Sequence, residues 1–174
     1  MFSPALAIRR TAVLATVALA LVSQAQTPNP LDNVPEKMPF DVPYGAPISL
    51  DRAEAAIQAA VAEARRRDWK LNVAVVDSGG NLVAFQRMDG AQLGSIQISQ
   101  AKAHSSAILR RETKAFEAGI QGGNNYLITL PGVIASRGGI PLIEGGKLIG
   151  AIGCSGATGS QDEVACKVGA ATVK

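Results

Sequence analysis

The sequence contains one histidine, His104, in the stretch QAKAHSSA from Gln100 to Ala107. An imidazole can bind a metal or a haem iron, act as a catalytic base, or lie as an ordinary polar residue on a helix. A serine hydrolase needs an imidazole beside an activated serine, and the sequence has no GxSxG elbow. One histidine and two cysteines are too few for a structural zinc site without distant carboxylates. The remaining roles for His104 are an axial ligand, a contact at the edge of a pocket and an interface residue.

Haem requires an apolar slot, one or two axial ligands and cations for its propionates. His104 can supply an imidazole, and Met88 can supply a thioether. The cations available to bind carboxylates are Arg87, Lys102, Arg110 and Arg111. Haem is therefore one candidate cofactor, with His104 as the candidate metal ligand, although a lone histidine on a helix is more often a surface or interface residue.

The two cysteines, Cys154 and Cys166, lie 12 residues apart. A redox pair more typically shows CxxC spacing. The sequence leaves open a structural disulfide or two buried free thiols.

Residues 1–25 resemble a secretory signal, with a basic pair at Arg9 and Arg10 and an apolar run over 11–22. Cleavage after Ala25 predicts a periplasmic or secreted protein. Without that basic pair, 17 − 2 = 15 Lys and Arg residues face 14 Asp and Glu residues, which argues against a nucleic-acid partner. No later apolar run approaches the roughly 20 residues of a transmembrane helix, so we expect no membrane insertion after signal removal.

Residues 26–47 hold six of the nine prolines and show no helical period, which predicts an extended arm. Its alternating apolar side chains can lie along a groove of the same subunit or of a neighbouring one. These side chains are Met38, Phe40, Val42 and Tyr44. The domain is expected over 48–174.

Hydrophobic periodicity predicts an α+β domain with an antiparallel sheet and helices packed on it. The expected elements are a helix from the Ser49 N-cap to 65–68, a hairpin over 71–87, a helix over 95–111, a strand over 126–130, a hairpin over 138–156 and a helix over 162–171. Ser160 is expected to begin a capping box for the last helix. Pro141 places its strand at a sheet edge.

The helix over 95–111 has two apolar faces, which predict two packing partners. Ile98, Ala101, Ile108 and Leu109 gather on one face, and Ile96, Ala103 and Ala107 gather on the opposite one. One partner is expected to be the sheet, and the other can be a second copy of the chain. His104 is expected at the flank between these faces.

Several motifs in combination resemble the GlcG/HbpS family of haem-binding proteins, which also includes the carboxy-terminal domain of PduO-type proteins. The motifs are VAVVDSGGNLVAFQRMDGA, SIQISQAKA and LPGVIASRGGIPLIEGGKLIGAIGCSGATGSQDEVAC, and the resemblance runs from Ile48 to about Ala171. It implies a five-stranded antiparallel sheet flanked by helices with profilin-like layering, assembly into homo-oligomers, and haem binding with scavenging, degradation or redox-sensing roles.

Many relatives carry the pattern A-K-A-x-T-A on the second helix. Lys102 and Ala103 match it, Ser105 keeps a hydroxyl, and His104 occupies the variable position. The resemblance therefore adds Lys102 and Ser105 to the candidate haem-binding residues, beside His104, Arg87 and Met88. The R-M-D-G motif is equally consistent with a turn brace in which Arg87 pairs with Asp89 and Met88 enters the core.

Two further hypotheses compete with an exported haem-binding oligomer. One is a cofactor-free periplasmic enzyme for a small oxygenated metabolite, with a polar cluster of Asp77, Arg87, Asp89 and Lys102. The other is a structural or partner-binding oligomer. Whether the protein is an enzyme is left open by the sequence.

Overall fold

Strand β1 (Asn72–Asp77) is buried at its first five residues and lies inside an antiparallel sheet. The structure is a computed structural model that describes residues 32–173. β1 is flanked by β2 (Leu82–Arg87) and β4 (Lys147–Ser155), and β3 (Gly139–Glu144) follows β4. The order β2-β1-β4-β3 leaves β2 and β3 at the edges, as Pro141 predicted for β3. The predicted signal, residues 1–25, lies outside the described residues.

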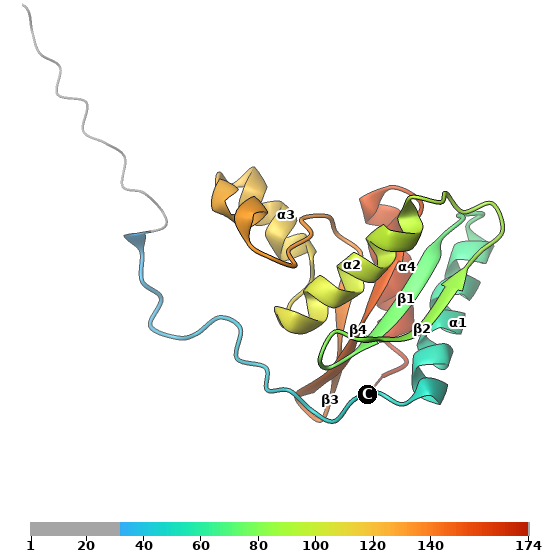
Figure 1. The fold of residues 1–174 in the computed structure, drawn as a ribbon, viewed down its shortest axis with the longest axis horizontal. Helices are drawn as coiled ribbons and strands as arrows, with labels where there is room; N and C mark the ends of the chain where they lie inside the picture. The colour runs from blue at the N-terminus through green and yellow to red at the C-terminus, as the bar shows by residue number, and fades with distance from the viewer. Residues whose placement is uncertain (1–31, 174) are drawn as a thin grey trace, which may run out of the picture. The chain divides into compact units, whose positions relative to one another are not determined.

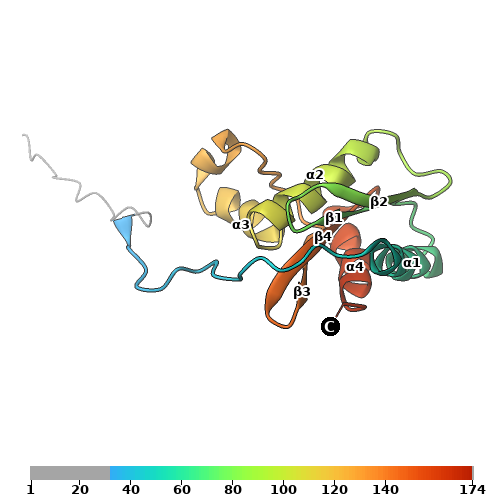
Figure 2. The same cartoon turned by 60° about the horizontal axis from the view of Figure 1, so that its bottom comes forward.

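Helices cover both faces of this sheet (Figure 1; Figure 2). α1 (Leu50–Arg66) and α4 (Gly159–Ala170) pack on one face, where Val73 and Val75 of β1 point. α2 (Ser95–Ile108) packs on the other face against Ala74 and Val76. Burial on both sides explains why β1 is apolar at successive positions instead of alternating with polar residues.

α2 lies unusually close to the sheet because small residues meet at the contact. A Cβ atom added to Gly153 of β4 would lie 2.5 Å from the backbone nitrogen of Ala103. A Cβ atom on Gly139 of β3 would lie 2.9 Å from the carbonyl carbon of Lys102. Only glycine permits this approach, which holds the α2 backbone at a fixed depth.

The sheet has four strands, so the expected fifth strand is wrong. The residues YLITL belong to a 3-10 helix, η2 (Asn125–Thr129), that follows a helix the sequence reasoning missed, α3 (Lys114–Gln121). The chain coils back on α3 through bonds such as Asn124 N–H to the Gly119 carbonyl. Leu127 is buried, whereas its β-branched neighbour Ile128 is 71% exposed. Local turns therefore override the strand propensity of this segment.

Two helix ends differ from expectation. α4 begins at Gly159, because the capping box is formed by Thr158 with Gln161 and not by Ser160. α2 ends at Ile108 instead of Arg111, and Arg110 adopts a left-handed φ of 55° just beyond it.

The described part of the arm lies against its own chain. Tyr44 forms a parallel bridge with Leu148 of β4, through Gly45 N–H to the Leu148 carbonyl at 2.7 Å and Leu148 N–H to the Pro43 carbonyl at 2.8 Å. Cys154 and Cys166 form a disulfide that joins β4 to α4, which settles the alternative left by the sequence. Within residues 32–173, no helix is both long and apolar enough to cross a membrane.

Candidate functional site

His104 lies on α2 where the β1–β2 turn meets the helix. Its Nδ1 is 3.0 Å from the carbonyl oxygen of Gly80. A carbonyl oxygen only accepts, so Nδ1 donates the hydrogen bond, and in the neutral imidazole Nε2 keeps the lone pair. This arrangement, in which one ring nitrogen is fixed by a carbonyl and the other is available, is the usual one for a metal-binding histidine.

Two glycines lie against the imidazole, and we call the group formed by His104, Gly80, Gly132 and Ile108 the His104 niche. A Cβ atom on Gly80 would lie 2.6 Å from Nδ1, and Gly80 has a φ of 84°. A Cβ atom on Gly132 would lie 3.8 Å from Nε2 and 2.9 Å from Cδ1 of Ile108. Gly80 thus approaches the Nδ1 side of the ring and Gly132 the Nε2 side, and a Cβ atom at either glycine would crowd the Ile108 side chain.

Nε2 of His104 has no hydrogen-bond partner among the described residues, yet it is not sealed in the core. Among the described residues, Oδ1 of Asn72 is the buried side-chain polar atom without a hydrogen-bond partner, so Nε2 of His104 is not one of these atoms. His104 itself is partly exposed. No group of three or more His, Cys, Asp or Glu residues within 32–173 is arranged to hold a metal ion.

Ser105, another candidate, is fully buried and shapes the niche from behind. Its Oγ accepts a hydrogen bond from Ile134 N–H at 3.2 Å. This bond fixes the loop after η2, which carries Gly132. Ser105 is therefore a positioning residue for the wall of the niche, and its hydroxyl does not face a ligand.

Lys102 forms a buried ion pair with Asp162 of α4. Nζ lies 2.8 Å from Oδ2 of Asp162 and 3.1 Å from the Cys154 carbonyl, and the two side chains are 2% and 3% exposed. Oδ1 of Asp162 accepts from Ala157 N–H at 3.1 Å. Burial raises the pKa of Asp162, while Lys102 and the backbone amides act in the opposite direction. Lys102 is therefore held inside the protein by Asp162 and the Cys154 carbonyl.

Arg87 and Met88 lie at the far end of the hairpin from Gly80 and His104. The Met88 sulfur accepts from Leu71 N–H at 3.4 Å and packs into the core on the α1 side, as the brace interpretation predicted. Arg87 and Asp89 are exposed and form no ion pair with each other, so the ion pair expected for the turn brace is absent. Met88 and His104 are on opposite faces of the sheet and do not face one iron.

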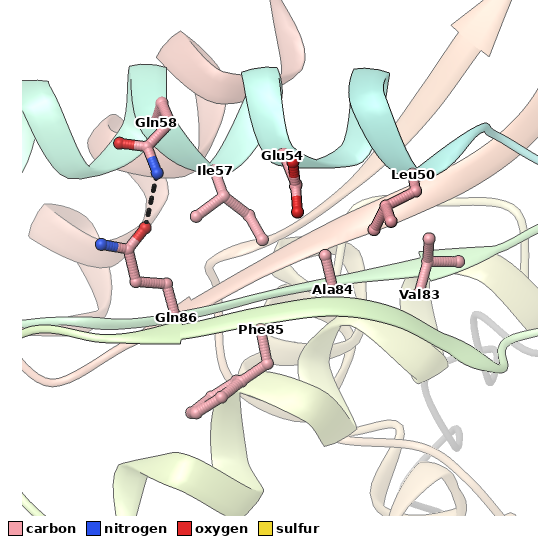
Figure 3. Close-up of a pocket in the computed structure, with 8 residues that line it drawn as sticks. All are labelled: Leu50, Glu54, Ile57, Gln58, Val83, Ala84, Phe85 and Gln86. Carbon is pink, nitrogen blue, oxygen red and sulfur yellow. Dashed lines mark hydrogen bonds between the residues drawn. The ribbon is translucent and has the colours of Figure 1, made fainter.

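A cavity of about 480 Å³ lies between α1 and the edge strand β2 (Figure 3). It is lined by Leu50, Glu54, Ile57, Gln58, Val83, Ala84, Phe85 and Gln86. Gln58 donates to Gln86 at 2.9 Å across it. A neighbouring cavity of about 360 Å³ is lined by Arg65, Lys70, Gln86, Arg87, Met88 and Asp89. Neither contains an imidazole, and the one possible thioether ligand is engaged with the backbone.

The polar cluster expected for a metabolite enzyme does not form. Asp77 accepts from the N–H groups of Gly79 and Asn81 within its own turn, at 2.8 and 2.9 Å. Arg87 lies opposite Asn72 in the register of β1 and β2, at the end of β1 away from Asp77. Lys102 is buried against Asp162. These groups therefore do not converge on one substrate.

Sequence reasoning missed Asp162 as the partner of Lys102 and missed the two glycines of the niche. Asp162 stands at the expected start of the last helix, where an acidic residue is common because it interacts favourably with the helix dipole. Gly132 follows Pro131, and Pro-Gly is a turn signal. Neither pattern indicates which helix will lie against it.

Comparison with known proteins shows similarity over the whole domain. The model of the family described as "Haem degrading protein HbpS-like" matches residues 48–171. Protein GlcG of Escherichia coli strain K12 is 40% identical over 108 residues, which are 62% of this chain and 81% of that protein.

Solved structures share the fold. The crystal structure of an HbpS double mutant from Streptomyces reticuli has a TM-score of 0.70 and 28% identity, covering 82% of this chain and 97% of that one. The crystal structure of the PduOC:Heme complex has a TM-score of 0.68 and 25% identity, covering 74% of this chain and 96% of that one. These findings confirm the resemblance seen in the sequence motifs.

The buried ion pair generates a test. Lys102→Met leaves the Asp162 carboxylate buried without a cation, so we expect the free energy of unfolding to fall by about 3–5 kcal/mol. The double variant Lys102→Met/Asp162→Leu should recover part of this loss, because no unpaired charge remains. Urea unfolding followed by circular dichroism measures both, with the exposed Lys114→Met as a control expected to change by about 1 kcal/mol or less.

The stability of Lys102→Met relative to wild type should depend on pH in a defined direction. A carboxyl whose pKa is raised in the folded state binds protons more tightly there, so its contribution to stability falls as pH rises through that pKa. Lys102→Met should therefore regain stability relative to wild type as pH is lowered toward the ordinary carboxyl range. A constant difference at all pH values would contradict this assignment.

Proposed function

The chain belongs to the HbpS-like family, and on that premise we propose that it is an exported, oligomeric protein that binds haem through His104. The supporting observation is the imidazole whose Nδ1 is held by the Gly80 carbonyl while Nε2 faces the glycine-bounded niche. The similarity to the PduOC:Heme complex supports the choice of haem as the ligand.

The residues of the niche fit a haem ligand in three respects. Nε2 is the ring nitrogen with a lone pair in the neutral imidazole, and the adjacent Gly132 brings no side chain against it. Ile108 supplies an apolar wall. Bound haem would supply a redox-active iron whose properties depend on its axial ligand. The chain's own part is to orient the imidazole through Gly80, and to hold the niche loop through Ser105.

Export is proposed from the sequence of residues 1–25. A basic pair, an apolar run and small residues before Gln26 match a secretory signal. The disulfide between Cys154 and Cys166 supports the proposal, because such bonds persist in oxidising compartments.

Homo-oligomer formation is proposed from the outer face of α2. Ala103 and Ala107 take the sheet-facing side, whereas Ile98 is 40% exposed and Ala101 is also exposed. The part of the second apolar face at Ile98 and Ala101 is therefore exposed within the described residues, while Ile108 and Leu109 are partly buried. A second copy of the chain would bury it.

Hemin titration followed by absorbance tests the haem proposal. Wild type should give a saturable Soret band at a fixed ratio to subunits. His104→Ala should shift the band and weaken binding by about tenfold or more, because the axial nitrogen is lost. Added free imidazole should restore the wild-type band position in His104→Ala.

Gln97→Ala on the exposed side of the same helix is the matched control and should bind like wild type. Equal saturable bands in wild type and His104→Ala would retain haem but remove His104 as ligand. The absence of a saturable band in either protein would contradict haem binding.

Export predicts that the protein recovered from the periplasm or medium begins at Gln26, as measured by amino-terminal sequencing or intact mass. Ala25→Arg should retain the precursor mass, since signal cleavage requires a small residue there. Recovery of the full-length chain in the cytoplasmic fraction would argue against export.

Oligomer formation predicts that sedimentation velocity of wild type shows a species larger than a monomer. Ile98→Asp should shift the distribution to smaller species by placing a charge in an apolar contact. Ala62→Asp, on the exposed side of α1, is the matched control and should leave it unchanged. A monomeric wild type at all concentrations would overturn the proposal.

A further inference from the structure

Two arginines just beyond α2 are partly buried without an acidic partner. The described residues contain six Lys or Arg side chains that form no ion pair. Two of them are Arg110 and Arg111, and the other four are all exposed. Those four are Lys37, Arg65, Arg87 and Lys147. Arg110 and Arg111 alone in this set combine partial burial with the lack of a carboxylate.

The arm holds Arg110 in a fixed orientation. Nη1 of Arg110 donates to the Val42 carbonyl at 3.1 Å, and the guanidinium lies 5.4 Å from the centre of the Tyr44 ring. The Tyr44 hydroxyl in turn donates to the Ile108 carbonyl at 2.8 Å. One edge of the Arg110 guanidinium is thereby fixed, and its remaining N–H groups have no partner among the described residues.

Arg111 is held between two aromatic rings. Its guanidinium carbon is 3.1 Å from the centre of the Phe40 ring and 5.0 Å from that of Phe116. Nε donates to the Leu109 carbonyl at 3.1 Å, which leaves the two terminal nitrogens available. Burial lowers the pKa of Arg111, and the adjacent Arg110 lowers it further, yet a guanidinium stays charged at neutral pH.

These two cations are connected to the His104 niche through Ile108. The Ile108 side chain bounds the niche, and its carbonyl accepts the Tyr44 hydroxyl that stands beneath Arg110. His104 and Ile108 are four residues apart and so lie on one side of α2. The niche and the arginine pair therefore share one end of the helix.

Oriented guanidinium groups without a carboxylate partner are suited to bind one, because charge-assisted hydrogen bonds to carboxylates are strong and planar. The aromatic rings of the arm add apolar surface next to them. We propose that Arg110 and Arg111, held by residues 40–44 of the arm, form a carboxylate-binding edge of the His104 site, which receives the propionates of the bound tetrapyrrole. This inference rests on the proposed haem function and assigns the orientation of the ligand.

The test compares hemin with hemin dimethyl ester, in which both propionates are esterified. Wild type should bind hemin about tenfold more tightly than the diester, because charged hydrogen bonds are lost with the ester. Arg110→Gln/Arg111→Gln should bind both forms equally and keep the Soret position of wild type, since His104 is unchanged. Arg65→Gln, an exposed arginine on α1, is the matched control and should keep the tenfold preference.

Arg110→Gln alone is the second variant, because removal of Arg111 from between Phe40 and Phe116 can lower stability. It should lose part of the preference while its thermal unfolding midpoint stays near that of wild type. Equal affinity of wild type for hemin and diester, or an undiminished preference in both arginine variants, would overturn the carboxylate edge while leaving haem binding intact. Failure of wild type to bind either form would overturn the proposed function itself.

Discussion

The buried ion pair between Lys102 and Asp162 is the interaction on which the arrangement of the site depends. Nζ of Lys102 binds Asp162 on α4 and the Cys154 carbonyl on β4, so one ammonium joins α2, the sheet and the opposite helix layer. Glycines leave room for this ammonium between the strands. A Cβ atom on Gly138 would crowd Nζ of Lys102, and one on Gly139 would collide with the Lys102 backbone. Desolvation makes such a pair costly to break and therefore a strong constraint on position.

Once α2 is fixed at this depth, its successive residues face different environments. Ala103 and Ala107 pack on the sheet, and His104 meets the β1–β2 turn through Gly80. Ser105 holds the loop that carries Gly132. The helix end then meets the arm through Ile108 and Tyr44. A single short helix thus orients the candidate ligand, the wall of its niche and the adjacent arginine pair, which explains why it is rich in small and polar residues.

Local patterns predicted those elements whose formation depends on nearby residues. The Gly-rich turns correctly predicted both hairpins, and Pro141 correctly predicted that β3 is an edge strand. The pattern failed for YLITL, where a short apolar run resembles a strand but forms a 3-10 helix stabilised by local turns. It also failed for Arg87 and Met88, since a sequence shows that a thioether and a cation exist but not that they lie at the end of the hairpin away from Gly80 and His104.

The sequence by itself determined the family, the α+β class, the two hairpins and His104 as the one imidazole, because motifs, turn residues and composition are local properties. The tertiary structure alone decided that Lys102 is a buried structural cation and that Cys154 and Cys166 are joined. It also decided that Nδ1 of His104 is occupied by Gly80 and that the arm lies over Arg110 and Arg111. These facts depend on which distant segments approach each other, and that approach is set by side-chain volume and by the energy of burying charge, which no local pattern records.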